Sequence, residues 1–182
     1  SDAECAQADY FLSICPPSDA LALAEKMAAI IAASNKKPVY VDCNAVSPQR
    51  KVIIGNTILK SGAAFVDVGI TGLPPSEGRS PALHASGPEA GKFGVLNDFG
   101  IKVNVIEGPI GAASALKMSY AGITKGMTAL GSMMMLAATR AGVAELARAE
   151  LERSHAALIT QFQRAVPDMF DKAYRFDGEM LE

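Results

Sequence analysis

One stretch of this sequence, residues 112–140, contains no proline, and its apolar side chains recur at the spacing of a helix. A stretch of this kind can form one unbroken helix, on the order of 43 Å long at the usual rise per residue. Its most apolar part lies between Lys125 and Arg140 and is shorter than the roughly 20 residues that span a bilayer. We therefore expect a long buried helix and no membrane span.

The residues before this helix have a different pattern. Up to residue 106, short apolar runs alternate with helical segments, and glycine or proline separates many of them. This alternation predicts a mostly parallel sheet with helices on both faces. We expect strands at 10–15, 39–42, 64–68, 82–86 and 102–106, and helices at 19–33, 48–60 and 88–99.

After the long helix, Gly142 predicts a break, a second helix follows over 143–165, and Pro167 predicts the start of a third segment. The predicted fold is α/β and then all-α: part of a Rossmann-type doubly wound sheet, residues 1–108, followed by a long-helix domain, residues 109–182. No G-x-G-x-x-G occurs in the sequence. We interpret the chain as an excerpt, truncated at both ends, that lacks the first β-α-β unit with that fingerprint.

Composition excludes several functions. The net charge is −2, and lysine and arginine form no dense cluster, which argues against a nucleic-acid partner. The three cysteines have no C-x-x-C spacing, and the two histidines, His84 and His155, lie far apart, so we expect no metal site. Sparse cysteines and the lack of a signal peptide favour a cytoplasmic protein.

Lys117 is the strongest catalytic candidate. It lies on the second turn of the long helix, where Tyr120, Ala121 and Thr124 share its face. Small and apolar neighbours would desolvate the ammonium group and lower its pKa, which suits a general base for a substrate hydroxyl. A lysine that extends its amine into solvent from an ordinary amphipathic helix is the alternative.

Several motifs carry a family resemblance when they are taken in order along the chain. They are Pro-Pro after the first strand, Val-Asp-Cys-Asn-x-x-Ser-Pro, Phe-Val-Asp-x-x-Ile-Thr-Gly, Ala-Ser-Gly-Pro and Gly-x5-Lys. Together they resemble the superfamily of 6-phosphogluconate dehydrogenase and 3-hydroxyisobutyrate dehydrogenase. The segment from Ser114 to Gly126 is most similar to a phosphogluconate-dehydrogenase-like branch with a short C-terminal domain of poorly assigned function.

The resemblance implies a role for several residues. Lys117 matches the catalytic lysine, and Thr71 and Gly72 match the pair that holds the substrate carboxylate. The cofactor would be NAD or NADP, which the sequence does not distinguish. Residues at the positions of the loops along the nicotinamide are Ile14, Cys15, Pro16 and Asn44.

Two positions depart from the family pattern. Ala121 stands where the family has an asparagine that orients substrate and base, and Thr124 stands where sugar-phosphate enzymes have an acidic proton donor. Tyr120 is a candidate replacement for the asparagine, and Lys125 is a candidate partner for an anionic group. With Thr124, they are the predicted substrate contacts on the long helix. The resemblance therefore does not extend to decarboxylation of 6-phosphogluconate.

From these observations we expect an NAD(P)-dependent oxidoreductase that acts on a small anionic hydroxy or oxo acid. The resemblance also implies a homodimer formed through the C-terminal helices. Two alternatives stay open: a dimerising remnant or accessory protein without catalysis, and a reductase of imines or other carbonyl analogues.

Overall fold

The computed structural model describes residues 1–172 and separates into two compact units, Ser1–Met118 and a second unit that begins at Ser119. The long helix begins in the first unit and continues into the second. The predicted division into 1–108 and 109–182 stays a prediction, and its last residues, 173–182, lie outside the described part.

The first unit contains a sheet of five strands in the order β1-β2-β3-β4-β5. The pairs β1–β2, β2–β3 and β4–β5 are parallel, and β3–β4 is antiparallel. The mostly parallel sheet is therefore confirmed. The strands are β1 Tyr10–Ser13, β2 Val39–Asp42, β3 Ala64–Thr71, β4 Ala82–Ser86 and β5 Val103–Val105.

β3 is longer than its sequence predicted. The apolar run was expected to end at residue 68, whereas the strand continues to Thr71. The extension exists because Ile70 and Thr71 pair with Leu83 and Ala82 of the antiparallel neighbour, a long-range contact that no local pattern reveals.

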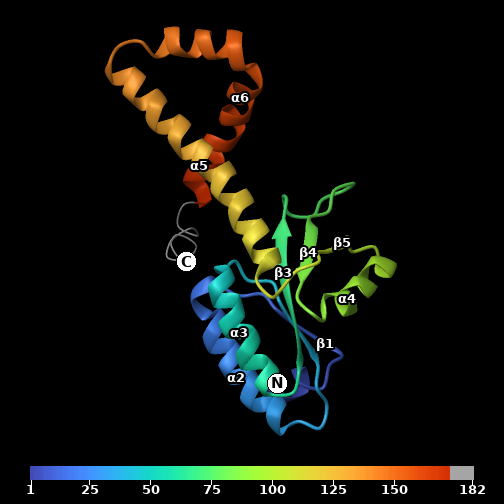
Figure 1. The fold of residues 1–182 in the computed structure, drawn as a ribbon. Coiled ribbons are helices and arrows are strands. Elements are labelled where there is room, and N and C mark those ends of the chain that lie inside the picture. Colours follow the sequence, from blue (N-terminus) through green and yellow to red (C-terminus); the bar gives the residue numbers. More distant parts are fainter. Residues whose placement is uncertain (173–182) are drawn as a thin grey trace. The chain divides into compact units, whose positions relative to one another are not determined.

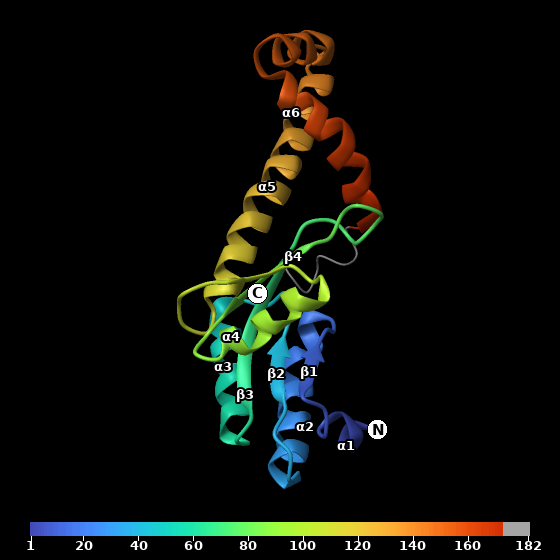
Figure 2. The ribbon, with the colours of Figure 1, turned by 90° about the vertical axis from the view of Figure 1, so that its right-hand side faces the viewer.

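Helices cover both faces of the sheet (Figures 1 and 2). Alternate residues of each strand point to opposite faces, so Tyr40 and Phe65 pack with α2 and α3, while Val41 and Val66 pack with α4. Ser47 caps α3 by accepting a hydrogen bond from the backbone N–H of Arg50, as its place before a proline predicts. The helical elements are α1 Asp2–Cys5, α2 Ala20–Ala33, α3 Pro48–Lys60, α4 Ala90–Phe93 and the 3-10 helices Pro17–Asp19 and Gly94–Phe99.

Two long helical segments follow the sheet: α5 Ala112–Arg140, which has the predicted bounds, and α6 Ala144–Lys172, which is kinked at His155. The expectation that the apolar part of α5 is buried is wrong, because Leu130, Met133 and Leu136 are each more than half exposed. The prediction of a new segment at Pro167 is wrong, because the proline lies inside α6 and the non-helical residue is His155, with φ −144° and ψ 48°. A proline removes one backbone hydrogen bond, and the helix continues past this loss. None of the helices among residues 1–172 is long and apolar enough to cross a membrane.

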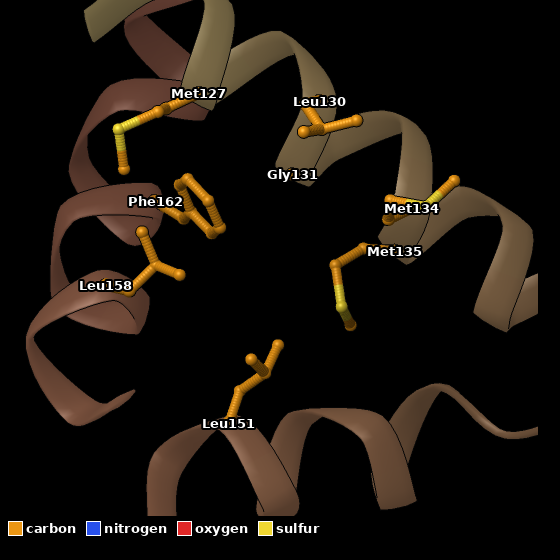
Figure 3. A pocket seen from close by; sticks show the side chains of 8 residues that line it. All are labelled: Met127, Leu130, Gly131, Met134, Met135, Leu151, Leu158 and Phe162. Carbon is orange, nitrogen blue, oxygen red and sulfur yellow. The ribbon is translucent and has the colours of Figure 1, made fainter. Parts of the chain in front are cut away.

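The second unit is held together by apolar packing between α5 and α6. Phe162 of α6 lies against Gly131 of α5 so closely that a Cβ at Gly131 would lie 2.3 Å from the ring. The hollow beside this contact measures about 240 Å³ and is lined mainly by methionine, leucine and phenylalanine side chains (Figure 3). It offers no polar group for chemistry.

Candidate active site

Four strands of the first unit each place a polar residue at the same level of the sheet, on the face that α2 and α3 cover. Ser13, Asp42, Asp67 and Ser86 are aligned in register across β1 to β4. Each is at most 1% exposed. A buried row of this kind requires internal partners, because unpaired polar groups away from water are costly.

Lys51 of α3 supplies the charge that this row needs. Its Nζ donates to Oδ1 of Asp42 at 2.6 Å and to the backbone carbonyl of Asp42 at 2.7 Å, and it lies 3.6 Å from Oδ1 of Asp67. All three side chains are fully buried. One ammonium group faces two carboxylates, so the cluster carries one net negative charge.

The start of α5 compensates this remaining charge. Oδ2 of Asp67 accepts hydrogen bonds from the backbone N–H groups of Gly111, at 3.0 Å, and Ser114, at 3.1 Å. The hydroxyl of Ser114 donates to Oδ1 at 2.7 Å, and that of Ser86 donates to Oδ2 at 3.1 Å. A helix N-terminus has free N–H groups and a partial positive charge. Asp67 of β3, which is far from α5 in the sequence, therefore caps this helix. The sheet thereby fixes the first turn of the helix that carries Lys117.

Lys117 lies against the next residues of β3. A Cβ built on Gly69 would be 3.1 Å from the Cβ of Lys117 and 2.6 Å from the carbonyl oxygen of Ala113. Only glycine therefore allows α5 to approach the strand this closely. The lysine is half-buried at this contact.

Thr71 and His84 extend the same face of the β3–β4 pair. Thr71 lies two residues beyond Gly69, and His84 lies opposite Gly69 on β4. Oγ1 of Thr71 is 3.0 Å from Nε2 of His84, which is hydrogen-bond distance. Gly72, which follows Thr71, is exposed and has a φ of 103°, a conformation that favours glycine.

The residues predicted along the nicotinamide meet at the carboxyl ends of β1 and β2. Asn44 is buried and joins the two loops: its Oδ1 accepts from the backbone N–H of Cys15 at 2.7 Å, and its Nδ2 donates to Oγ of Ser13 at 2.8 Å. Ile14 is 67% exposed, and Pro16 is exposed beside it.

These loops fit one half of a dinucleotide. In open α/β sheets a ligand lies outside the carboxyl ends of the strands, and exposed Ile14 and Pro16 provide an apolar surface there for a flat ring. The sequence has no G-x-G-x-x-G to hold a pyrophosphate. The residues present therefore fit the nicotinamide end of a cofactor, and this sequence has no glycine-rich motif to bind its pyrophosphate.

Cys43 lies beside this cluster but is no candidate nucleophile. Its thiol is buried, and burial raises its pKa to about 12, although Lys51 and Lys117 act in the opposite direction. A thiol with so high a pKa stays protonated, and the thiolate is the reactive form. Burial also raises the pKa of the Cys15 thiol.

The other predicted substrate residues lie in the second unit. Tyr120 is 55% exposed. The hydroxyl of Thr124 donates a hydrogen bond to the backbone carbonyl oxygens of Tyr120 and Ala121, at 3.0 and 3.3 Å. Its proton is therefore engaged by the backbone of α5. Lys125 is half-buried. The substrate contacts of these three residues stay predictions.

The buried row and its lysine are the part of the site that sequence reasoning missed. A signal existed, because each of four predicted strands has a serine or an aspartate among its last three residues. Lys51 gave none, since an isolated lysine in a helix resembles a surface residue. Among residues 1–172, no group of three histidine, cysteine or acidic side chains is placed to bind a metal.

Comparison with known proteins places this architecture. Residues 138–182 match a domain of unknown function, DUF1932. An uncharacterised 28.5 kDa protein of Methanothermus fervidus is 35% identical over 124 residues, which are 67% of this chain and 45% of that protein. This chain therefore spans less than half the length of that relative.

Solved structures share the fold. A conserved protein of unknown function, described as structurally similar to 3-hydroxyacid dehydrogenases, matches with a TM-score of 0.75 and 27% identity over 98% of this chain and 67% of that chain. 3-Hydroxyisobutyrate dehydrogenase of Salmonella typhimurium matches with a TM-score of 0.66 and 17% identity over 93% and 61%. An imine reductase of Myxococcus stipitatus in complex with NADP+ matches with a TM-score of 0.63 and 20% identity over 97% and 62%. These findings confirm the superfamily resemblance and the fold class.

Proposed function

This chain has the fold of the hydroxyacid dehydrogenases, and from that premise we propose that it is part of an oxidoreductase that transfers hydride between NAD(P) and a small hydroxy or oxo acid. The observation that carries the proposal is the way the structure fixes the position of Lys117. Buried Asp67 caps the helix that carries Lys117. The Cβ of Lys117 packs against Gly69, which lies two residues before Thr71 on β3. A fixed base beside a hydroxyl is what oxidation of an alcohol requires.

Lys117 acts as the general base in this proposal. In the oxidation direction, the substrate O–H bond breaks and its proton moves to Nζ of Lys117, while the C–H bond of the same carbon breaks and a carbonyl forms. The nicotinamide, when bound, accepts the hydride. In the reverse direction the ammonium group of Lys117 returns the proton to the carbonyl oxygen.

Thr71 and Gly72 bind the substrate carboxylate in this proposal. The hydroxyl of Thr71 and the backbone N–H groups beyond it are donors at the end of a strand, and donors of this kind suit a carboxylate. Gly69 and Thr71 lie on the same face of β3, so the carboxylate and the reacting hydroxyl would lie along that face. Tyr120 and Lys125 are proposed as further contacts, to a hydroxyl and to an anionic group.

The first test is an assay of the full-length protein with NAD+ and NADP+ against a panel of small hydroxy acids. We expect nicotinamide reduction with at least one acid, and a preference for one dinucleotide. Tyr120→Phe and Lys125→Ala test the two proposed contacts through KM. If neither dinucleotide binds and no acid is oxidised, the protein is an accessory or dimerising protein, and the proposal is wrong.

Reduction of an imine is the second candidate. Ala121 and Thr124 stand where the superfamily resemblance implies an asparagine and an acidic proton donor. An imine reductase shares the fold over 97% of this chain. A cyclic imine in the same panel, assayed with NADPH and NADH, separates the two. Turnover of the imine without any of the hydroxy acids would favour this reading.

A second copy of the chain is the proposed partner. Large apolar side chains on α5 stay exposed within the second unit, including Leu130 at 56%, Met133 at 57% and Leu136 at 61%. An apolar surface of this kind is typical of an interface. Sedimentation equilibrium should give a dimer, and Met133→Glu should shift it toward a monomer.

A further inference from the structure

Thr71 and His84 form a hydrogen-bonded pair whose geometry fixes how the threonine hydroxyl can act. Oγ1 of Thr71 lies 3.0 Å from Nε2 of His84. Both side chains are half-buried. A hydroxyl has one proton, and a neutral imidazole nitrogen either donates or accepts, so the pair has two arrangements.

The two arrangements differ in what they offer a ligand. If Nε2 carries the proton, it donates to Oγ1, and the hydroxyl proton of Thr71 can point away toward an anion. If Nε2 is bare, the hydroxyl donates to it, and only lone pairs face the ligand, which repel a carboxylate. A carboxylate on Thr71 therefore selects a ring with a proton on Nε2, which is either the neutral Nε2–H tautomer or the cation. Of these two forms, the cation also attracts the carboxylate by its charge.

The surroundings of His84 favour the neutral ring before a ligand binds. The pKa of His84 lies below its ordinary value, mainly because of burial and then because of Lys102, which precedes β5. On the other side of the pair, Lys117 of α5 covers Gly69, the residue opposite His84. Both charged groups are cations, so the charges near the pair favour a bound anion.

We propose that His84 is a positioning residue for the substrate carboxylate, which orients the hydroxyl of Thr71 and binds more favourably when its ring is protonated. The inference rests on the proposed function and extends it to specificity: the site selects acids over neutral alcohols, and more strongly as the pH falls. By linkage, a carboxylate that binds better to the protonated ring must raise the pKa of His84 by the same free energy.

The test uses the full chain and malonate, a dicarboxylate that has no hydroxyl to oxidise. The sequence contains only two histidines, so the ring signals in a ¹⁵N NMR spectrum are few, and His155→Gln assigns them. Saturating malonate should raise the pKa of His84 and bring its Nε2 signal to the protonated form. The signal of His155 is the internal control and should not move.

Two matched variants complete the test. Thr71→Val removes the hydroxyl and should weaken malonate binding roughly tenfold and abolish the shift at His84. Thr71→Ser keeps the hydroxyl and should preserve both. His84→Gln keeps an N–H donor, so binding should persist while its dependence on pH is lost.

The inference is overturned if malonate does not bind, or if it binds without changing the pKa of His84, or if Thr71→Val binds it as well as the wild type. These outcomes are independent of turnover. A protein that oxidises no hydroxy acid, yet shows the shift at His84, would contradict the proposed reaction and leave the carboxylate site standing.

Discussion

Gly69 of β3 leaves no room for a side chain of its own beside Lys117 of α5, because a Cβ at Gly69 would lie 3.1 Å from the Cβ of Lys117. The same Cβ would lie 2.6 Å from the carbonyl oxygen of Ala113, which is backbone and cannot rotate away. Strand β3 and helix α5 can therefore keep their spacing only with glycine at this position.

Gly69→Ala should force the strand and the helix apart. We expect a loss of about 1–3 kcal/mol in the free energy of unfolding, as is typical of overpacked sites. Because the displaced helix carries Lys117, turnover should fall even where the variant is fully folded. Urea denaturation and kcat measure the two effects. Gly91→Ala, where the added Cβ meets nothing within 4 Å, is the control and should match the wild type in both.

Asp67→Ala should destabilise the first unit more than any surface change. It leaves the N–H groups of Gly111 and Ser114 without their acceptor and removes one of the two carboxylates beside Lys51. Breaking a buried ion pair of this kind costs about 3–5 kcal/mol. Ser114→Ala, which loses only its hydroxyl hydrogen bond, should cost about 1 kcal/mol. Equal losses in the two variants would show that Asp67 does not anchor the helix.

Lys51→Met should destabilise the first unit. Without the ammonium group, the neighbouring carboxylates of Asp42 and Asp67 stay fully buried and lose the cation that faces both of them. Leaving a buried charge without its partner costs about 3–5 kcal/mol in the free energy of unfolding. Urea unfolding curves at neutral pH measure this loss.

A double variant separates charge from packing in that result. Lys51→Met with Asp42→Asn removes one carboxylate charge together with the ammonium group. It should recover part of the lost stability. A double variant no more stable than Lys51→Met would contradict the assignment of the loss to this carboxylate pair.

Cysteine labelling should follow burial and thiol pKa. Cys5 is exposed, Cys15 is partly buried with a raised pKa, and Cys43 is buried with a pKa of about 12. In mildly alkaline buffer, iodoacetamide should modify Cys5 fastest, Cys15 slowly and Cys43 only after denaturation. Peptide mass spectrometry gives the three rates. Modification of Cys43 in the native protein at the rate of Cys5 would rule out its burial.

Much of the fold could be predicted from the sequence, because its elements follow local patterns. The bounds of α5 and α3 were predicted correctly from the lack of proline and from the Ser47-Pro48 cap. The exceptions depend on distant contacts. β3 extends to Thr71 through pairing with β4, and α6 continues through Pro167, where sequence reasoning expected a break.

The site was predictable only in part. Lys117 and Thr71 came from ordered motifs, and the structure places Lys117 of α5 against Gly69, two residues before Thr71 on β3. The cluster of Lys51, Asp42 and Asp67 was not foreseen, because its members come from separate elements and meet only through strand register. Nor could the sequence indicate that Gly69 is required by the approach of α5.

Lys117 is the general acid and base in the proposed reaction, and the rate of the Lys117→Ala variant tests this role most directly. With saturating substrate and dinucleotide, kcat should fall roughly 10²–10⁴-fold, as expected for loss of such a group. The dissociation constant of the dinucleotide should stay unchanged, and added methylamine should restore part of the rate. A Lys117→Ala protein with the kcat of the wild type would contradict the account.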